Sequence, residues 1–308
     1  MDTGLNEGIA NTLVVRAESS LAGSLTGSTY AFDGRIAFST EPVLGGNVPK
    51  RNVWRAQDGD SYSARSYRAT IDMEWSHGEL TALLLASLFR RTGTTPNYTF
   101  KPGGLSLKQS LAIGFGYVPN GLEFVLRGAI VESMQVALRP REVSRVRFGI
   151  VAAKLTTDGP IAAVTAGNIF RVKGDATAEY DSIPNPRVYD FSLEAVQRIN
   201  FANFGEDGTP TDYAPEKFDV SIDLAEWMAN TGPEGDQIAG DVRNQNEVTL
   251  LVSTVPAPGK LLTFTIPRMI NRSGTPPLLS PGGIGYRASA EAQSSVSRTD
   301  LTSITMSI

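Results

Sequence analysis

The feature that most constrains this fold is a stretch from Leu105 to Ala153 in which apolar and polar residues alternate. Positions 133–139 read SMQVALR and positions 145–150 read RVRFGI, so every second side chain is apolar. A repeat of two residues is typical of β-strands that have one face buried and the other exposed to solvent. A meander of this kind must bury its apolar face against a second sheet or a helix. Turn formers divide the stretch into four predicted strands, at about 105–113, 122–131, 133–139 and 143–152.

A strand followed by a helix precedes this meander. Tyr67–Trp75 alternates cleanly between apolar and polar positions, which predicts a strand. Ser76 then stands where a helix cap is expected, with Glu79 at the third helical position. The expected buried stripe of the helix is Leu80, Leu83, Leu84 and Phe89.

The second half of the chain repeats several strings of the first half in the same order. FDVSIDLAEW (Phe218–Trp227) resembles YRATIDMEW (Tyr67–Trp75), and two further short echoes follow. The further echoes pair Leu262–Phe264 with Leu122–Phe124, and Ile284–Tyr286 with Val146–Phe148. We interpret the order as an internal duplication, although any two β domains share short alternating strings. The Gly-rich MANTGPEGDQIAGDVRNQ stands where the first half has its helix, and it predicts at best a short or broken one.

These observations predict four segments. They are an N-terminal arm (1–29), a first β domain (30–158), a second β domain (159–294) and a C-terminal extension (295–308). The arm, the loop at 40–65 and the extension have too little apolar periodicity to pack within one subunit, although Leu301, Ile304, Met306 and Ile308 give the end of the chain a β-like alternation. We expect these three segments to become ordered only on assembly, at contacts between subunits or rings.

Composition excludes several classes of protein. The 308 residues include no cysteine, so disulfides, thiolate metal sites and a cysteine nucleophile are ruled out. No apolar run approaches the ~20 residues of a membrane helix, and the first residues lack a signal-peptide pattern, so we expect no membrane insertion. The net charge of −4 disfavours tight binding to nucleic acid.

The residues of an enzyme are also missing from the sequence. The single histidine, His77, lies at the predicted helix start, where a surface or capping role is expected. No nucleophile elbow, HExxH pair or Walker loop occurs, and Asp58, Asp60, Glu206 and Asp207 lack the spacing of an EF-hand. We therefore predict no catalytic, metal or cofactor site. A pair of carboxylates acting on a glycan is the enzyme alternative.

Three parts of the chain, spread over most of 65–292, resemble the tail tube (major tail) proteins of long-tailed bacteriophages. The similarity is one of pattern and order. It is carried by YRATIDMEWSHGELTALLLASLF, by LEFVLRGAIVESMQVALRPREVSRVRFGIVAA, and by FSLEAVQRINFANFGEDGTPTDYAPEKFDVSIDL with the closing LLTFTIPRMI and YRASAEAQ.

This resemblance implies a mainly β fold, with a tandem pair of related β-sandwich or half-barrel domains, each flanked by a helix. It also implies rings that stack into the hollow tail tube of the virion, assembled in the bacterial host cytoplasm. Three chains would form a pseudo-hexameric ring if both halves are tube domains, and six chains if only one is. Its partners would be the tape measure, terminator and baseplate proteins, with double-stranded DNA passing through without tight binding. A terminator or baseplate component is the structural alternative.

Two sets of residues are candidates for function. Polar residues that alternate with the core positions of two strands could face the channel: Thr70, Asp72, Glu74, Asp219, Ser221 and Asp223. A solvated outer face is the ordinary alternative for such residues. Candidates for contacts between subunits are Arg51, Trp54, Arg55, Leu301 and Ile304. A tryptophan that covers its own domain is the alternative for Trp54.

Overall fold

The computed structural model describes residues 13–32, 34–42, 65–102, 108–117, 122–157, 170–172, 176–180, 183–185, 188–204, 209–228, 247–280, 283–292 and 302–307. Within these ranges the chain is mainly β, with one helix, α1 (Glu79–Leu88). The strands are β1 (Leu13–Glu18), β2 (Leu25–Phe32), β3 (Gly34–Pro42), β4 (Arg65–Glu74), β5 (Ser76–His77), β6 (Arg90–Thr94), β7 (Asn97–Lys101), β8 (Leu111–Tyr117), β9 (Leu122–Leu138), β10 (Arg145–Thr156), β11 (Phe170–Arg171), β12 (Thr177–Tyr180), β13 (Ile183–Asn185), β14 (Val188–Phe204), β15 (Pro210–Met228), β16 (Glu247–Ala257), β17 (Lys260–Ser280), β18 (Gly283–Ala292) and β19 (Ser303–Ser307).

An antiparallel layer of eight strands runs through the whole molecule. Its order is β3-β4-β10-β9-β14-β15-β18-β17, with one strand from each half of the chain meeting at the β9–β14 pairing. We call this the long layer. It is not closed into a barrel, because β3 and the second half of β17 are its two ends.

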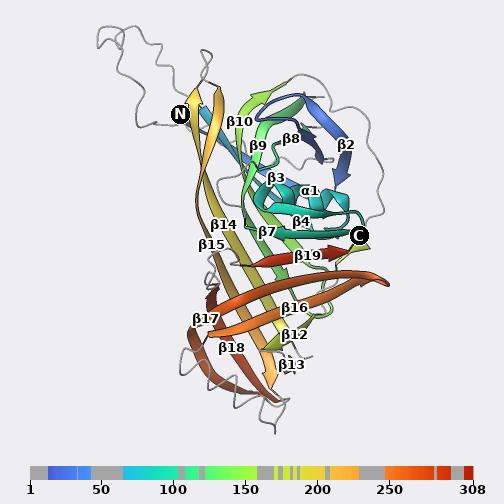
Figure 1. The fold of residues 1–308 in the computed structure, drawn as a ribbon, viewed down its shortest axis with the longest axis vertical. Helices are drawn as coiled ribbons and strands as arrows, with labels where there is room; N and C mark the ends of the chain where they lie inside the picture. The colour runs from blue at the N-terminus through green and yellow to red at the C-terminus, as the bar shows by residue number, and fades with distance from the viewer. Residues whose placement is uncertain are drawn as a thin grey trace, which may run out of the picture.

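The remaining strands, apart from the separate two-stranded sheet of β5 and β11, form a second layer that packs against the long layer. One part runs β2-β1-β8 and joins the first half of β9. The other part runs β13-β12-β16, continues through the first half of β17, and then passes to β19, β7 and β6. Figure 1 shows β16 crossing the long hairpin of β14 and β15 at a steep angle, with β19 and β7 running in a similar direction beside it. The architecture is a sandwich of crossed layers.

The same six antiparallel pairings occur once in each half of the chain. In the first half they are β1–β2, β1–β8, β8–β9, β9–β10, β10–β4 and β4–β3. In the second half they are β12–β13, β12–β16, β16–β17, β17–β18, β18–β15 and β15–β14. In each half, the strand that enters from the second layer (β9 or β17) continues into the long layer. We call these strands the N-terminal set and the C-terminal set.

The alternation seen in the sequence explains which face of the long layer is buried. Ile71, Phe148, Val136 and Leu193 lie on the face turned toward the second layer, and their side chains are at most 1% exposed. Large aromatic rings fill the space between the layers. The centroids of Phe191 and Phe264 lie 5.6 Å apart, and the ring of Trp75 meets Phe264 edge-on at 5.7 Å. Burial of this apolar face is the main favourable term in the folding of such a sandwich.

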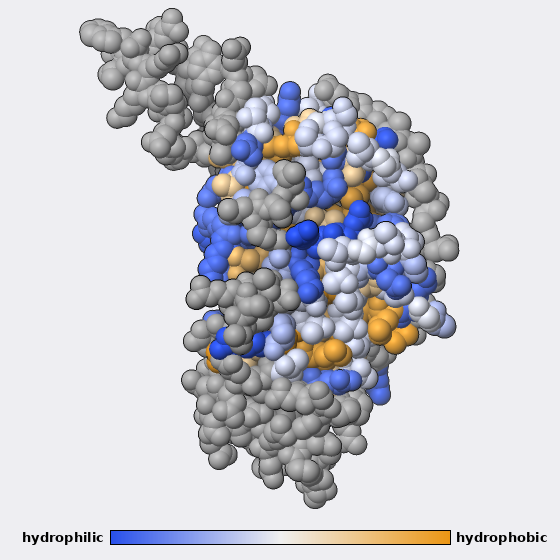
Figure 2. All heavy atoms as spheres, viewed as in Figure 1, coloured by the Kyte–Doolittle hydropathy of each residue, from blue (hydrophilic) through white to orange (hydrophobic). Residues whose placement is uncertain are grey.

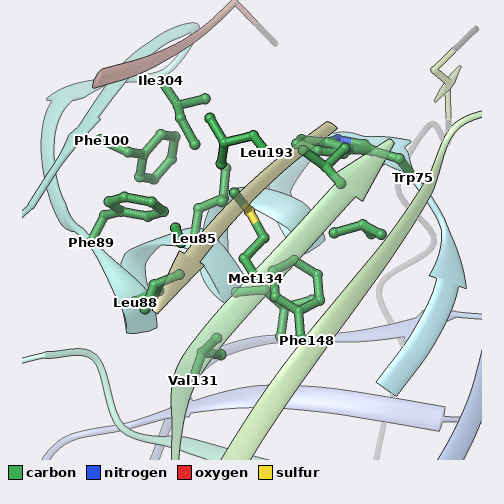
Figure 3. Packing of buried hydrophobic residues seen from close by; sticks show 14 of the residues in the cluster. Trp75, Leu85, Leu88, Phe89, Phe100, Val131, Met134, Phe148, Leu193 and Ile304 are labelled. Carbon is green, nitrogen blue, oxygen red and sulfur yellow. The ribbon is translucent and has the colours of Figure 1, made fainter. Parts of the chain in front are cut away.

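Helix α1 lies within the core, between the layers. All residues from Leu80 to Leu88 are buried, including the predicted Leu80, Leu83 and Leu84, and Phe89 follows them into the interior. Figure 3 shows Leu85, Leu88 and Phe89 lying between the second-layer residues Phe100 and Ile304 and the long-layer residues Met134 and Leu193. The predicted cap is wrong, because Ser76 belongs to β5 and Gly78 begins the helix without a side-chain cap.

A buried carboxylate fixes the bend of β9 where that strand leaves the second layer. Glu18 accepts hydrogen bonds from Arg127 Nε (2.5 Å), Ser110 Oγ (2.7 Å) and the amide of Gly128 (2.9 Å). Gly128 has a φ of +62°, in the left-handed region that only glycine adopts readily. A Cβ at this position would lie 2.8 Å from the Cβ of Ala153, so the close packing also requires glycine.

Several predicted boundaries differ from the structure. The two strands predicted at 122–131 and 133–139 are one strand, β9, with a register shift near Glu132. Residues 13–29 are no arm, because β1 and β2 belong to the N-terminal set and Leu13 is fully buried. The C-terminal extension is likewise a core strand from 303 to 307, since β19 pairs with both β17 and β7. Positions 1–12, 43–64 and 229–246 lie outside the described residues.

Candidate functional surface

The six residues predicted to face a channel lie on one side of the long layer. Thr70, Asp72 and Glu74 alternate with buried residues of β4, and Asp219, Ser221 and Asp223 do the same in β15. Because side chains of neighbouring strands in register point to the same side, this surface continues from strand to strand. We call it the open face, and it is exposed in the single chain.

Strand pairing extends the open face without a break across the two sets. Asp72 is opposite Arg147, Arg147 is opposite Gln135, and Gln135 is opposite Glu194. The row then continues through Ser221 to Glu291. Four members of this surface were not among the residues predicted to face a channel: Arg147, Gln135, Glu194 and Glu291. Their alternation with buried neighbours was the available signal.

Charges of both signs cover the open face. In the N-terminal set, Arg145 binds Asp72 with an Nη2–Oδ1 distance of 2.8 Å. In the C-terminal set, Lys217 lies 2.5 Å from Asp219, and Ser289 donates a hydrogen bond to Asp223. Arg145 and Lys217 are thus held close to carboxylates, whereas a surface that grips phosphate backbones presents a continuous array of free Lys and Arg side chains. Figure 2 shows the opposite side of the molecule, where the second layer lies, and there hydrophilic and apolar side chains are interspersed.

The pairing of β9 with β14 joins the two sets within the chain. It runs from Ser133 opposite Val196 to Leu138 opposite Phe191. Beyond it, the β14–β15 hairpin crosses onto the N-terminal set, where Ile199 packs with Ile130 and Val151 in a small buried cluster. The amide of Lys108 donates a hydrogen bond to Tyr213 Oη (2.6 Å), which holds the hairpin from the other side. We call this arrangement the internal joint.

Lys108 places a buried amine at the internal joint. Its Nζ is buried and has no hydrogen-bond partner in the structure, and burial lowers the pKa of the amine to about 8. The nearby carboxylate of Glu132 opposes this shift and raises the pKa. Glu132 itself is bound by Arg68 at 2.8 Å.

The two ends of the long layer have edges that no described strand covers. The outer edge of β3 is one, since β3 pairs only with β4 among the described strands. The outer edge of β17 is the other, from the point after Ile270 where its pairing with β16 stops. Uncovered edges present rows of backbone N–H and C=O groups to another chain.

The predicted contact residues are placed differently. Arg51, Trp54, Arg55 and Leu301 lie outside the described residues, so their proposed role stays a prediction. Ile304 is fully buried between β17 and β7 of its own chain, where it supports the core. An exposed contact at Ile304 is therefore not what the single chain presents.

The single histidine of the sequence belongs to the two-stranded sheet of β5 and β11. His77 lies in β5, opposite Phe170 of β11. No group of three or more His, Cys, Asp and Glu residues with the geometry to hold a metal ion occurs among the described residues. In the same ranges, no helix is long and apolar enough to cross a membrane.

Comparisons with known proteins add no relative. No model of a protein family matches the chain, and a search of curated proteins finds no match.

Proposed function

We propose that this chain is the tail tube protein of a long-tailed bacteriophage. In this proposal three chains form a ring, the long layers of the three chains join around a channel, and stacked rings build the tube that conducts DNA during genome ejection. The resemblance in sequence supplies the family, and the structure supplies the features that make the proposal specific.

The observation that carries the proposal is the repetition of six strand pairings in the two halves of the chain. Two unrelated β domains have no reason to share these six pairings in the same order along the chain, so we infer that the halves are related domains. In this proposal, the internal joint is the contact through which one domain adds its four long-layer strands to those of the next. A ring of six such domains needs three chains.

The open edges support a closed ring. A long β layer with two uncovered ends invites uncontrolled association, and closing the layer on itself removes both ends. A contact between two different surfaces closes into a ring when the rotation it imposes divides a full turn. In the proposed ring, the end of each chain's layer meets the beginning of the next.

The open face supports a conducting role. In the ring it lines the channel, because the opposite face of the long layer is filled by the core of the sandwich. Its carboxylates, including Glu194, Asp219 and Asp223, repel phosphates, and several of its cations are held by acidic neighbours. Such a surface lets DNA slide, whereas a basic one would retain it. The tape measure, terminator and baseplate proteins of the tail are the expected partners.

Electron microscopy and mass measurement test this function together. The purified chain, concentrated in stages, should form rings or hollow tubes of uniform width in negative stain. Native mass spectrometry of the smallest ring should give three copies of the 33.0 kDa chain. A ring of six chains would contradict the tandem arrangement. A chain that remains monomeric at every concentration, even when an initiating tail-tip complex is added, would overturn the proposal.

A further inference from the structure

We infer that the uncovered edge of β17 pairs, antiparallel, with the uncovered edge of β3 in a second copy of the chain, with Thr275 opposite Arg35. This joint between chains repeats the internal joint, and the inference rests on the proposed ring. It specifies which edges meet and in which register, which the ring by itself leaves open.

The register follows from equivalent positions in the two sets. Ile71 of β4 corresponds to Ile222 of β15, the central residues of the two similar strings. Ile36 pairs with Ile71, and Leu193 pairs with Ile222, so Ile36 corresponds to Leu193. Because Arg35 and Ser192 each lie one position before these two residues, Arg35 of β3 corresponds to Ser192 of β14.

The other edge is obtained through β10 and β18. In the N-terminal set, Glu74 of β4 leads to Arg145 and then to Ala137 of β9. In the C-terminal set, the equivalent path leads from Ala225 of β15 to Arg287 and then to Thr275 of β17. Thr275 therefore corresponds to Ala137. Because Ala137 lies opposite Ser192 in the internal joint, Thr275 is placed opposite Arg35 of the next chain.

Two further observations agree with this register of β17 against β3. The internal joint ends at Leu138 opposite Phe191, which corresponds to Pro276 opposite Gly34. Gly34 is where β3 begins, and a proline at Pro276 has no N–H to offer a ladder, so pairing stops there. At the other end, the edge of β17 becomes uncovered after Ile270, where β16 stops. The part of β17 between Ile270 and the end of pairing at Pro276 is therefore as long as the part of β9 that pairs in the internal joint.

The contact has a direction, because β3 and β17 are different surfaces. Each chain uses its β17 edge toward one neighbour and its β3 edge toward the other, which is the head-to-tail arrangement of a ring. Two chains that offer the same edge should not pair in this way. This asymmetry makes the inference accessible to a mixing experiment.

Disulfide trapping provides the test, and the absence of natural cysteine in the chain makes it clean. Directly opposed residues on antiparallel strands are close enough to be bridged. The double variant Arg35→Cys/Thr275→Cys, oxidised after assembly, should give covalent dimers and trimers on a non-reducing gel. An equal mixture of the two single variants should give only dimers, and each single variant alone should give none.

Two matched controls define the result. Ala137→Cys/Ser192→Cys places cysteines at the equivalent pair of the internal joint, and it should form a disulfide within one chain. Ser39→Cys/Thr275→Cys is out of register by four residues, roughly 13 Å along the strand, and should not be trapped. These controls report whether the geometry of such a pair permits a bridge and whether trapping is selective.

The outcomes separate this inference from the proposed function. Rings or tubes that form normally, and in which the internal pair bridges while Arg35→Cys/Thr275→Cys does not, overturn the register and leave the tube intact. Preferential trapping of the Ser39→Cys/Thr275→Cys pair likewise overturns the register. Absence of any assembly overturns the proposed function, and the joint between chains falls with it.

Discussion

At the scale of single residues, Gly128 connects backbone geometry to the packing of β9. Its amide is bound by Glu18, its φ is positive, and the space above its Cα is filled by Ala153 and the backbone of Ala22. The bend that these contacts fix lets β9 belong to both layers. A side chain at this position should therefore disturb the passage of the strand from one layer to the other.

We predict that Gly128→Ala lowers the free energy of unfolding by about 2–4 kcal/mol, from backbone strain together with overpacking. Gly27→Ala is the matched control, because Gly27 has a similar φ of +68° but nothing within 4 Å of its Cβ position. That control should lose only about 1 kcal/mol from strain. Urea unfolding of both variants measures the difference. Equal losses would show that the contacts with Ala153 and Ala22 are unimportant.

Lys108 gives a prediction that depends on pH. Its pKa is about 8 in the folded chain and 10.5 as the ordinary value, so the unfolded state binds more protons between these two values. The contribution of Lys108 to the free energy of unfolding should therefore increase as the pH rises from about 8 to 10.5. Below pH 8 the chain must bury a charged amine.

Replacing the amine by an apolar side chain should remove this penalty. We predict that Lys108→Met stabilises the chain at pH 7 by about 1–3 kcal/mol, and that the advantage shrinks toward zero by pH 10.5. Urea unfolding of both proteins at pH 7, 8.5 and 10 measures the trend. An advantage that is independent of pH would show that packing, and not charge, is responsible.

At the scale of elements, the strand β19 is part of the core of the single chain, which the sequence did not predict. Its apolar alternation was recognised, but it was expected to become ordered only on assembly. In the structure Ile304 and Met306 are buried, and β19 bridges β7 of the first half to β17 of the second. Sequence periodicity shows that a strand has a dry face, but it carries no information about which distant strands will cover that face.

We predict that Ile304→Asp, or removal of residues 302–308, prevents folding of the single chain. An unpaired charge placed in this interior costs several kcal/mol, and the loss of the strand uncovers both β7 and β17. Thr305→Asp, a change on the half-exposed side of the same strand, should be tolerated. Circular dichroism and gel filtration of the three proteins distinguish these effects. A folded, monomeric chain lacking β19 would contradict the prediction.

The strands themselves were largely predictable. The string YRATIDMEW predicted β4, and FDVSIDLAEW lies within β15, because a half-buried strand leaves a period of two in the sequence. The match of Ile284–Tyr286 with Val146–Phe148 paired the correct strands, β18 and β10, but at the wrong residues. Val146 corresponds through the pairings to Ala288, four residues beyond the Ile284 to which the sequence had matched it. Register shifts in β17 and differing loop lengths conceal such offsets from sequence comparison.

At the scale of the whole molecule, the open face was predictable in part. Alternation identified Asp72 and Asp223 as polar residues opposite a core, each within its own strand. That they share one continuous surface depends on the β9–β14 joint, which connects segments far apart in the sequence through backbone hydrogen bonds. Backbone pairing has no residue signature. The sequence could therefore predict the strands and their faces but not the layer that unites them.

The proposed channel predicts how DNA behaves in assembled tubes. Glu194→Lys/Asp219→Lys should leave assembly intact, because both side chains are exposed, and should make the tubes retain double-stranded DNA at low salt. Retention should weaken steeply as salt increases, since counterions compete for the phosphates. Glu142→Lys/Glu179→Lys adds the same charge at exposed positions outside the open face. Equal retention by both variants in co-sedimentation would place the channel elsewhere.

The position of β19 has a consequence for the synthesis of the protein. Both strands that it joins, β7 and β17, precede it in the chain, so they leave the ribosome before the strand that fills the gap between them. A chain whose translation stops early keeps an uncovered interior, and such chains are recognised by chaperones and proteases. Only chains translated through this strand reach a closed core. In the proposed tube, this order of strands would keep incompletely translated subunits out of the assembly, where one defective subunit would interrupt the stacked rings.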